Sequence, residues 1–194
     1  FLLIVKGDGN EVDMGTVIVR CSSILGMTGL KLIIGQLPGL GAGVSRTANG
    51  CSVTIGDRVV INGVTLYLQE DHSRVSIGDD SQLSWGVDVW CTDAHTITDL
   101  EGNPVNYAES IEIGRHVWVG KDVKIGKNVR IADNSIVGWG SIVTKRFDEP
   151  NVILAGTPAK IVKRGINWDR KCINKYAKGL YPHFRSSELY GKTL

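Results

Sequence analysis

Aliphatic side chains recur at every sixth position through the second half of the chain. From Ile113 the sequence divides into six consecutive hexads, IGRHVW, VGKDVK, IGKNVR, IADNSI, VGWGSI and VTKRFD. Each hexad opens with Ile or Val, and its second residue is Gly, Ala or Thr. The fifth residue of one hexad and the first of the next lie two apart, so they share one face of a short strand. We therefore expect coils of three short strands and three corners, with the aliphatic residues pointing inward.

The same frame extends toward the N-terminus with interruptions. Parallel stacking of such coils fills the interior with aliphatic layers, and each repeat is stabilised by its neighbours. An α-helix is disfavoured because the period is six, Gly recurs and β-branched residues dominate the inward positions. Gly accounts for 24 of 194 residues, and we expect the second-position Gly to let the chain turn its corners. The earlier first positions are Val12, Ile18, Ile24, Leu30, Ile55, Ile61, Ile77, Leu83 and Val89.

Three segments, 36–53, 69–76 and 95–112, break the frame. Insertions in a solenoid leave the stack and commonly carry its function. The last segment is the most informative, because its would-be inward positions hold His95, Glu101 and Tyr107. We expect it to leave the coil as a protruding loop.

Composition is that of one globular domain. The chain has 42% hydrophobic and 22% charged residues and a net charge of +2, which excludes disorder and collagen-like repeats. The apolar run at residues 1–5 is too short to span a membrane, and no secretory leader pattern follows it. We expect a soluble cytoplasmic protein. Because the first residue is Phe1, we expect the chain to begin inside a longer product.

Charge is distributed unevenly along the chain. Residues 1–144 contain 11 basic and 16 acidic residues, whereas residues 145–194 contain 11 basic and 4 acidic ones. This cationic tail suits a ligand that carries several phosphates, with a merely solvated basic cap as the alternative. Basic residues do not alternate with aromatic ones, which argues against a nucleic acid partner. The four cysteines form no C-x-x-C pair, so we expect reduced thiols, with Cys21, Cys51 and Cys172 as small buried packing groups.

Three local motifs accompany the repeat: CTDAHTITD from Cys91, IGRHVWVG from Ile113 and ILAGTPAKIVKRGINW from Ile153. With the hexads they resemble the hexapeptide-repeat acyltransferases, most closely the bacterial capsule and polysialic acid O-acetyltransferases, over about residues 50–170. The resemblance implies an all-β, left-handed parallel β-helix over residues 1–164 and a short C-terminal extension over residues 165–194. It also implies a homotrimer with each active site between two prisms. Left-handedness comes from the resemblance alone, since parallel crossovers are generally right-handed.

The resemblance places the catalytic base at His95, and the chemistry agrees. A sugar hydroxyl attacks a thioester carbonyl effectively only when a positioned base removes its proton, and neutral imidazole suits this near pH 7. Asp93 or Asp99 could orient the imidazole, and we favour Asp93. Alternation points Trp118 outward, and the resemblance puts it in the active site, with subunit-interface packing as the alternative. His116, on a turn, is expected to be solvated.

Cys91 offers a second mechanism, in which its thiolate accepts the acyl group and His95 activates it. We disfavour this mechanism because the resemblance implies direct transfer from donor to acceptor. In the repeat frame Cys91 also occupies a third, turn position.

For the donor, the resemblance implies acetyl-CoA as co-substrate, bound along a groove parallel to the helix axis. The cationic tail supports this independently, because coenzyme A carries several phosphate charges. The expected groove residues are Gly120, Lys121, Trp139, Thr144 and Lys145, with Lys160 and Lys163 toward the phosphates.

The favoured function is transfer of an acetyl group to a hydroxyl of a cell-surface polysaccharide. N-acetylation of an amino sugar is the alternative that uses the same donor, and a non-catalytic β-helix scaffold is a third. A zinc hydratase of the γ-carbonic anhydrase type is disfavoured, because His72, His95 and His116 lie 23 and 21 residues apart without a close pair. We therefore expect no metal.

Overall fold

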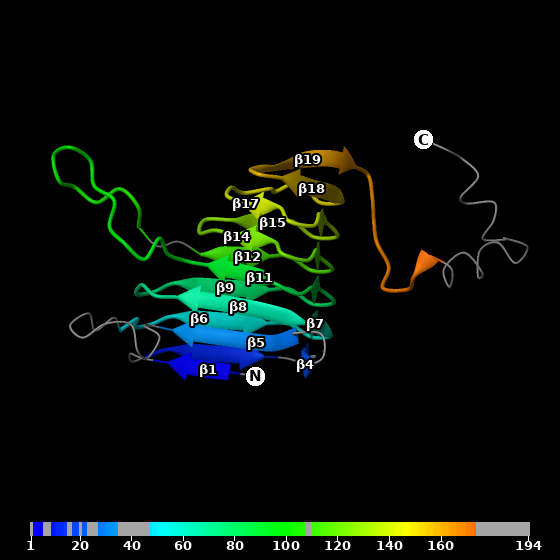
Figure 1. Cartoon of the computed structure of the whole chain (residues 1–194), viewed down its shortest axis with the longest axis horizontal. Coiled ribbons are helices and arrows are strands. Elements are labelled where there is room, and N and C mark those ends of the chain that lie inside the picture. Colours follow the sequence, from blue (N-terminus) through cyan, green and yellow to red (C-terminus); the bar gives the residue numbers. More distant parts are fainter. Residues whose placement is uncertain are drawn as a thin grey trace, which may run out of the picture.

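The computed structural model describes residues 2–5, 9–14, 17–19, 21–22, 27–34, 47–107 and 110–173. Its strands build a three-sided prism, to which each coil contributes one strand per face (Figure 1). Face A comprises β1 (Leu2–Val5), β5 (Met27–Ile34), β8 (Gly63–Leu68), β11 (Val87–Trp90), β14 (Lys124–Ile125) and β17 (Ile142–Val143). Face B comprises β2 (Glu11–Met14), β6 (Ser52–Ile55), β9 (Arg74–Ile77), β12 (Ile111–Ile113) and β15 (Arg130–Ile131). Face C comprises β3 (Val17–Val19), β7 (Val59–Ile61), β10 (Gln82–Leu83), β13 (Trp118–Val119), β16 (Ile136–Val137), β18 (Val152–Gly156) and β19 (Ala159–Arg164).

Strands of successive coils pair in parallel within each face, as the hexads predict. Among the described strands, two pairs are antiparallel: β4 (Cys21–Ser22) with β5, and β18 with β19 at the C-terminal end of the stack. The chain passes from face B to face C to face A in every coil. Its corners therefore line up along three edges of the prism, which we call the BC, CA and AB edges.

The core contains the predicted first-position residues together with fifth-position residues such as Val117, Val123 and Val129. From Leu30 onward, each first-position residue in the described coils is at most 2% exposed, which confirms the frame. Val12 is the exception at 36%, because β2 is the outermost described strand of face B and is covered from one side only. Ile24 lies outside the described residues.

The backbone conformation at the corners differs from the expectation that the second-position Gly makes the turn. The left-handed conformation falls on the fourth residue of the hexad, with φ of 53° at His116 and 58° at Asp122. Second-position Gly instead gives room to the next coil. A Cβ at Gly78 would lie 2.7 Å from the main-chain nitrogen of Arg115, and one at Gly120 would lie 2.7 Å from the carbonyl oxygen of Val137. The expectation that these glycines turn the corners was therefore wrong, and close approach of backbones is the reason for them.

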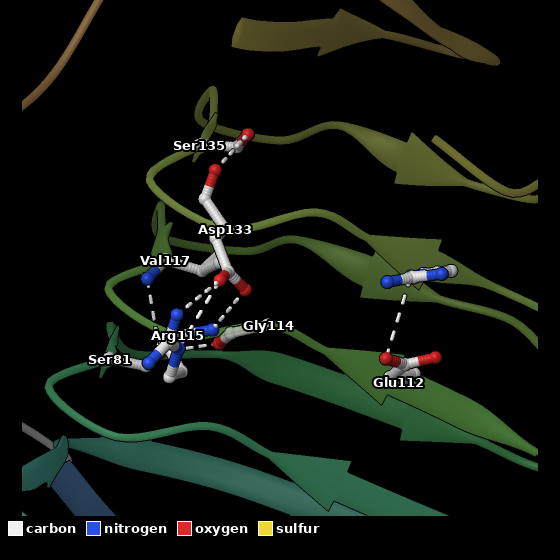
Figure 2. A network of polar contacts seen from close by, with 8 residues as sticks. Ser81, Glu112, Gly114, Arg115, Val117, Asp133 and Ser135 are labelled. Carbon is white, nitrogen blue, oxygen red and sulfur yellow. Dashed lines mark hydrogen bonds and ion pairs between the residues drawn. The ribbon is translucent and has the colours of Figure 1, made fainter. Parts of the chain in front are cut away.

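Polar side chains tie the coils together along the BC edge (Figure 2). Asp133 accepts a hydrogen bond of 2.8 Å from the main-chain nitrogen of Arg115 and pairs with its guanidinium at 3.2 Å. Ser81 donates to the carbonyl of Gly114 and accepts from the main-chain nitrogen of Val117, both at 3.0 Å. Each such contact joins neighbouring coils, so the edge adds to the ladder hydrogen bonds in fixing their register.

After β19 the chain runs back along the stack (orange in Figure 1). We call residues 166–173 the C-terminal strap. It begins beside Asn151, which exchanges two hydrogen bonds with Ile166. Residues 174–194 of the expected C-terminal extension lie outside the described residues. Among the described residues, no helix is long and apolar enough to cross a membrane.

Candidate active site

The predicted protruding loop is present and projects from the AB edge between β11 and β12 (green in Figure 1). His95, Glu101 and Tyr107 are all exposed, as expected of positions that have left the coil. The loop has its own internal order. Thr98 and Pro104 form an antiparallel bridge, and the main-chain nitrogen of Val105 donates to the carbonyl of Ile97 at 2.9 Å.

His95 lines a cavity of about 550 Å³ beside the loop. The residue before it, Ala94, has φ of 60°, a left-handed conformation that residues with a Cβ seldom adopt. This local backbone is held from below, because Thr92 accepts a hydrogen bond of 2.8 Å from the main-chain nitrogen of Ala94 and donates to Glu70. The cavity is lined by Gln69, Glu70, Ala94, His95, Thr96, Pro104, Asn106 and Tyr107.

Asp93 lies in a network beneath the loop. Its Oδ2 pairs with Lys127 Nζ at 2.6 Å and accepts a hydrogen bond of 2.8 Å from Asn106 Nδ2. The hydrogen bond from Lys127, followed by that from Asn106, holds the pKa of Asp93 below its ordinary value. Asn106 Nδ2 also donates to the carbonyl of His95 at 2.8 Å. Within the described residues, Asp93 therefore reaches the backbone of His95 through Asn106 and makes no hydrogen bond to the imidazole.

Asp99, the other carboxylate considered for His95, lies at the hairpin of the loop. It accepts hydrogen bonds of 2.8 and 3.0 Å from the main-chain and side-chain nitrogens of Asn103. These bonds lower the pKa of Asp99. Its carboxylate therefore shapes the loop, and nothing in its contacts joins it to His95.

Lys127, Glu70 and Thr92 were not predicted from the sequence. Lys127 occupies an ordinary third position of a hexad, and only the stacking of its coil on the coil that carries β11 brings it to Asp93. Glu70 lies in the interruption at 69–76, and that break in the frame was the available signal for it.

Cys91 was expected at a turn position. It is instead fully buried in the core. The reason is that the pattern of β11 continues by one residue: the main-chain nitrogen of Cys91 still bonds to the carbonyl of Tyr67, at 3.0 Å, so its side chain points inward like those of Val87 and Val89. Burial raises the pKa of the Cys91 thiol to about 12. A thiol of this kind is a poor nucleophile near neutral pH.

Trp118 points outward from β13 and is 39% exposed, as alternation predicted. The expectation of a solvated His116 was wrong. Trp168 of the strap stacks on the His116 ring, with centroids 4.5 Å apart and planes inclined by 12°. The Trp168 ring also lies 5.9 Å from that of Trp118. An aromatic cluster of His116, Trp118 and Trp168 thus joins the strap to face C and the BC edge.

The predicted donor residues lie on different edges of the prism. Gly120, Lys121 and Trp139 lie at the CA edge, where Lys121 Nζ is 5.6 Å from the Trp139 ring centroid. Thr144 and Lys145 lie at the AB edge, after β17. A single chain therefore does not bring the whole set together.

The cationic residues of the tail meet at the C-terminal end of the stack. A cavity of about 450 Å³ there is lined partly by Lys145, Lys160 and Arg164, and Lys163 belongs to the same strand, β19. Opposing charges are present as well, since Arg164 pairs with Glu149 at 3.0 Å. His72 and His95 lie at the AB edge, whereas His116 lies at the BC edge, so the three histidines do not converge. Among the described residues, no group of three or more His, Cys, Asp or Glu could hold a metal ion.

A three-faced parallel β-helix with a histidine-bearing loop defines the class: a left-handed β-helix of the hexapeptide-repeat acetyltransferases. The chain is 34% identical to a polysialic acid O-acetyltransferase of Neisseria meningitidis over 192 residues, which are 97% of this chain and 87% of the relative. The chain belongs to the family of hexapeptide-repeat O-acetyltransferases that contains this enzyme. No family model matches the chain.

Further similarities agree with this assignment. A polysialic acid O-acetyltransferase of Escherichia coli is 34% identical over 142 residues, which cover 66% of this chain and 45% of that relative. The crystal structure of the polySia-specific acetyltransferase NeuO has a TM-score of 0.64 at 25% identity, and the match covers 92% of this chain and 97% of that one. A galactoside acetyltransferase solved in complex with coenzyme A shares the fold, with a TM-score of 0.52 at 23% identity over 92% of this chain and 71% of that one.

Proposed function

We propose that the protein transfers an acetyl group from acetyl-CoA to a hydroxyl of an anionic cell-surface glycan, polysialic acid or a related capsule polymer, with His95 as the general base. The observation that carries the proposal is the position of His95 at a cavity, on a loop whose base is held by two polar networks, one to the preceding coil and one to the following coil. One network joins Asp93, Asn106 and Lys127. The other joins Glu70, Thr92 and Ala94. A base held in this way fits direct transfer, because proton removal depends on geometry before basicity.

In the proposed reaction the acceptor oxygen attacks the thioester carbonyl carbon while its proton passes to the imidazole of His95. The tetrahedral intermediate then breaks its C–S bond. The leaving sulfur takes the proton back from the imidazolium, and the products are the acetylated sugar and free coenzyme A. Asp93 acts as a positioning residue, because its contacts fix Asn106, which holds the main chain at His95.

For the donor, we assign the phosphates of coenzyme A to Lys160, Lys163 and Lys145. The cavity at the C-terminal end of the stack, lined in part by Lys145 and Lys160, supports this assignment. Gly120, Lys121, Trp139 and Thr144 line the remainder of the proposed groove, and Trp118 lies in the active site beside the acceptor.

We further propose a homotrimer, and the assignment of the donor residues supports a groove shared between subunits. The donor residues at the CA edge and those at the AB edge belong to different edges of one prism, so a groove that uses both sets lies between two prisms. The His95 loop at the AB edge of one subunit then meets the CA edge and face C of its neighbour. We propose that the protein acts in the cytoplasm, and the free thiols of Cys51, Cys91 and Cys172 are in keeping with this location.

The test is release of coenzyme A from acetyl-CoA by the wild type and His95→Ala, with sialic acid polymers, neutral capsule fragments and amino sugars as acceptors. We expect turnover with the anionic polymers in the wild type, and none in the variant although it still binds acetyl-CoA. His72→Asn is the matched control, since His72 is exposed at the same edge and its φ of 60° is tolerated by Asn. Turnover only with amino sugars would establish N-acetyl transfer instead, and equal turnover in His95→Ala would remove His95 as the base.

A further inference from the structure

Trp168 is held rigidly on one side. Its indole nitrogen donates to the carbonyl of His116 at 2.8 Å, and its own carbonyl lies 3.0 Å from Nε2 of the His116 ring. Stacking on the imidazole covers one face of the indole. Because the N–H group of Trp168 is already satisfied, what the side chain can offer a ligand is its opposite, apolar face.

The strap itself is fastened on both sides of Trp168. Ile166 exchanges hydrogen bonds with Asn151. Beyond Trp168, the guanidinium of Arg170 donates to the carbonyls of Asp80 at 2.6 Å and Arg58 at 2.8 Å. The aromatic face is therefore presented in a preorganised position, which lowers the conformational entropy that the protein loses when a ligand binds.

A cavity of about 430 Å³ lies over the strap and is lined by Asn167, Trp168, Asp169, Lys171 and Ile173. The set combines an aromatic face, a cation and two groups that accept hydrogen bonds from hydroxyls. Sugar rings present C–H groups on one side and hydroxyls at their rim, and an aromatic face with polar neighbours matches both. The ammonium of Lys171 matches a carboxylate as a point charge.

We propose that the strap forms an acceptor subsite, in which the indole of Trp168 stacks on a sugar ring of an anionic glycan and Lys171 binds a carboxylate of that glycan. The proposal rests on the proposed function, because the subsite is placed beside the active site by the contact between Trp168 and Trp118. An adenine ring of the donor is the competing ligand for an indole. The donor phosphates are already assigned to Lys145, Lys160 and Lys163, so the KM for acetyl-CoA decides between the two ligands.

The experiment compares Trp168→Ala, Trp168→Phe and Lys171→Ala with the wild type, using acetyl-CoA and sialic acid oligomers. We expect Trp168→Ala to raise the KM for the oligomer about tenfold, as for the loss of one stacking contact, with the KM for acetyl-CoA unchanged. Trp168→Phe should restore most of the affinity. Lys171→Ala should raise the oligomer KM as well, and its effect should shrink at high salt. Trp90→Ala is the matched control, since Trp90 is also 38% exposed and belongs to β11 of face A.

An unchanged oligomer KM in Trp168→Ala would overturn the subsite, and so would a parallel rise in the KM for acetyl-CoA, which would assign the indole to the donor. An equal effect of Trp90→Ala would also overturn it. Calorimetric titration of the oligomer separates this proposal from the proposed function. Binding by the wild type that Trp168→Ala weakens, without acetylation by either, would support the subsite and reject the transferase reaction. Absence of both binding and turnover in the wild type would reject both.

Discussion

The indole of Trp168 lies flat on the imidazole of His116, across 52 residues of sequence. The rings are 4.5 Å apart and inclined by 12°, and two main-chain carbonyls complete the pair, one accepting from each ring. Because a carbonyl oxygen only accepts hydrogen bonds, Nε2 of His116 carries a proton and donates it to the carbonyl of Trp168. The pair attaches the strap to the BC edge, at the coil that also carries Trp118.

We expect His116→Asn to loosen the strap while leaving the β-helix folded. Asn accepts the left-handed conformation that His116 has at φ of 53°, so the substitution removes the stack without straining the corner. Trypsin cleavage after Arg170 and Lys171 should become faster, as followed by mass spectrometry. His72→Asn makes the same exchange at φ of 60° on another edge. Cleavage at the wild-type rate in His116→Asn would mean that the stack does not hold the strap.

Lys127→Met should lower kcat about tenfold, as for the misplacement of a catalytic base by a loosened loop. Lys127 joins two parts of the loop, since its Nζ lies 2.6 Å from Asp93 and donates to the carbonyl of Asn106 at 2.6 Å. The KM for acetyl-CoA should not change. Lys124→Met is the control, because it breaks a similar pair of 2.6 Å with Asp88 away from the loop. Equal kcat values for the two variants would argue against a role for Lys127 in positioning His95.

The contribution of Asp93 to the stability of the folded protein should decrease as the pH falls into the acid range. Its pKa is lowered in the folded protein, so its stabilising effect is complete above the pKa of the unfolded chain and disappears as the pH falls through the folded value. The difference in thermal stability between the wild type and Lys127→Met should therefore be constant from about pH 6 to 8 and shrink below about pH 4. Thermal unfolding at a series of pH values measures it. A difference that grows in acid would contradict the assignment.

Cys91→Ala should keep kcat within about twofold of the wild type, because a thiol whose pKa burial raises to about 12 is neither exposed nor ionised near neutral pH. In the native protein, a maleimide should label Cys172, which is exposed, long before Cys91. Peptide mapping locates the label. Rapid labelling of Cys91 with parallel loss of turnover would restore the thiolate mechanism.

Gly78→Ala should destabilise the protein by about 1–3 kcal/mol, as for overpacking in a close contact. The added Cβ would lie 2.7 Å from backbone atoms of Gly114 and Arg115 in the next coil. Gly126→Ala is the matched control, since Gly126 also holds a second position but its Cβ would meet nothing nearer than 3.7 Å. Urea unfolding of both variants tests this. Equal stability of the two would show that the coils separate at little cost.

The hexads alone predicted the strands, the inward aliphatic residues and the loop that carries His95. This was possible because each inward position repeats locally, and because the polar residues at 95, 101 and 107 cannot fill a place in an aliphatic core. The same local reasoning misplaced Cys91. The main-chain hydrogen bond from Cys91 to Tyr67 of the preceding coil continues the alternation of β11 by one residue. The side chain of Cys91 therefore points into the core and not toward the corner.

What the period determined is therefore the coil, its core and the place where the repeat breaks. Only the tertiary structure decided which polar side chains meet at the edges. Lys127 reaches Asp93 because its coil stacks directly on the coil from which the loop leaves, and Trp168 reaches His116 because the strap folds back along the BC edge. A periodic pattern specifies which way each side chain points, since that depends on neighbours one or two residues away. Contacts between edges and loops depend on how separate coils stack and on the path of the chain outside the coils. The hexad repeat specifies neither.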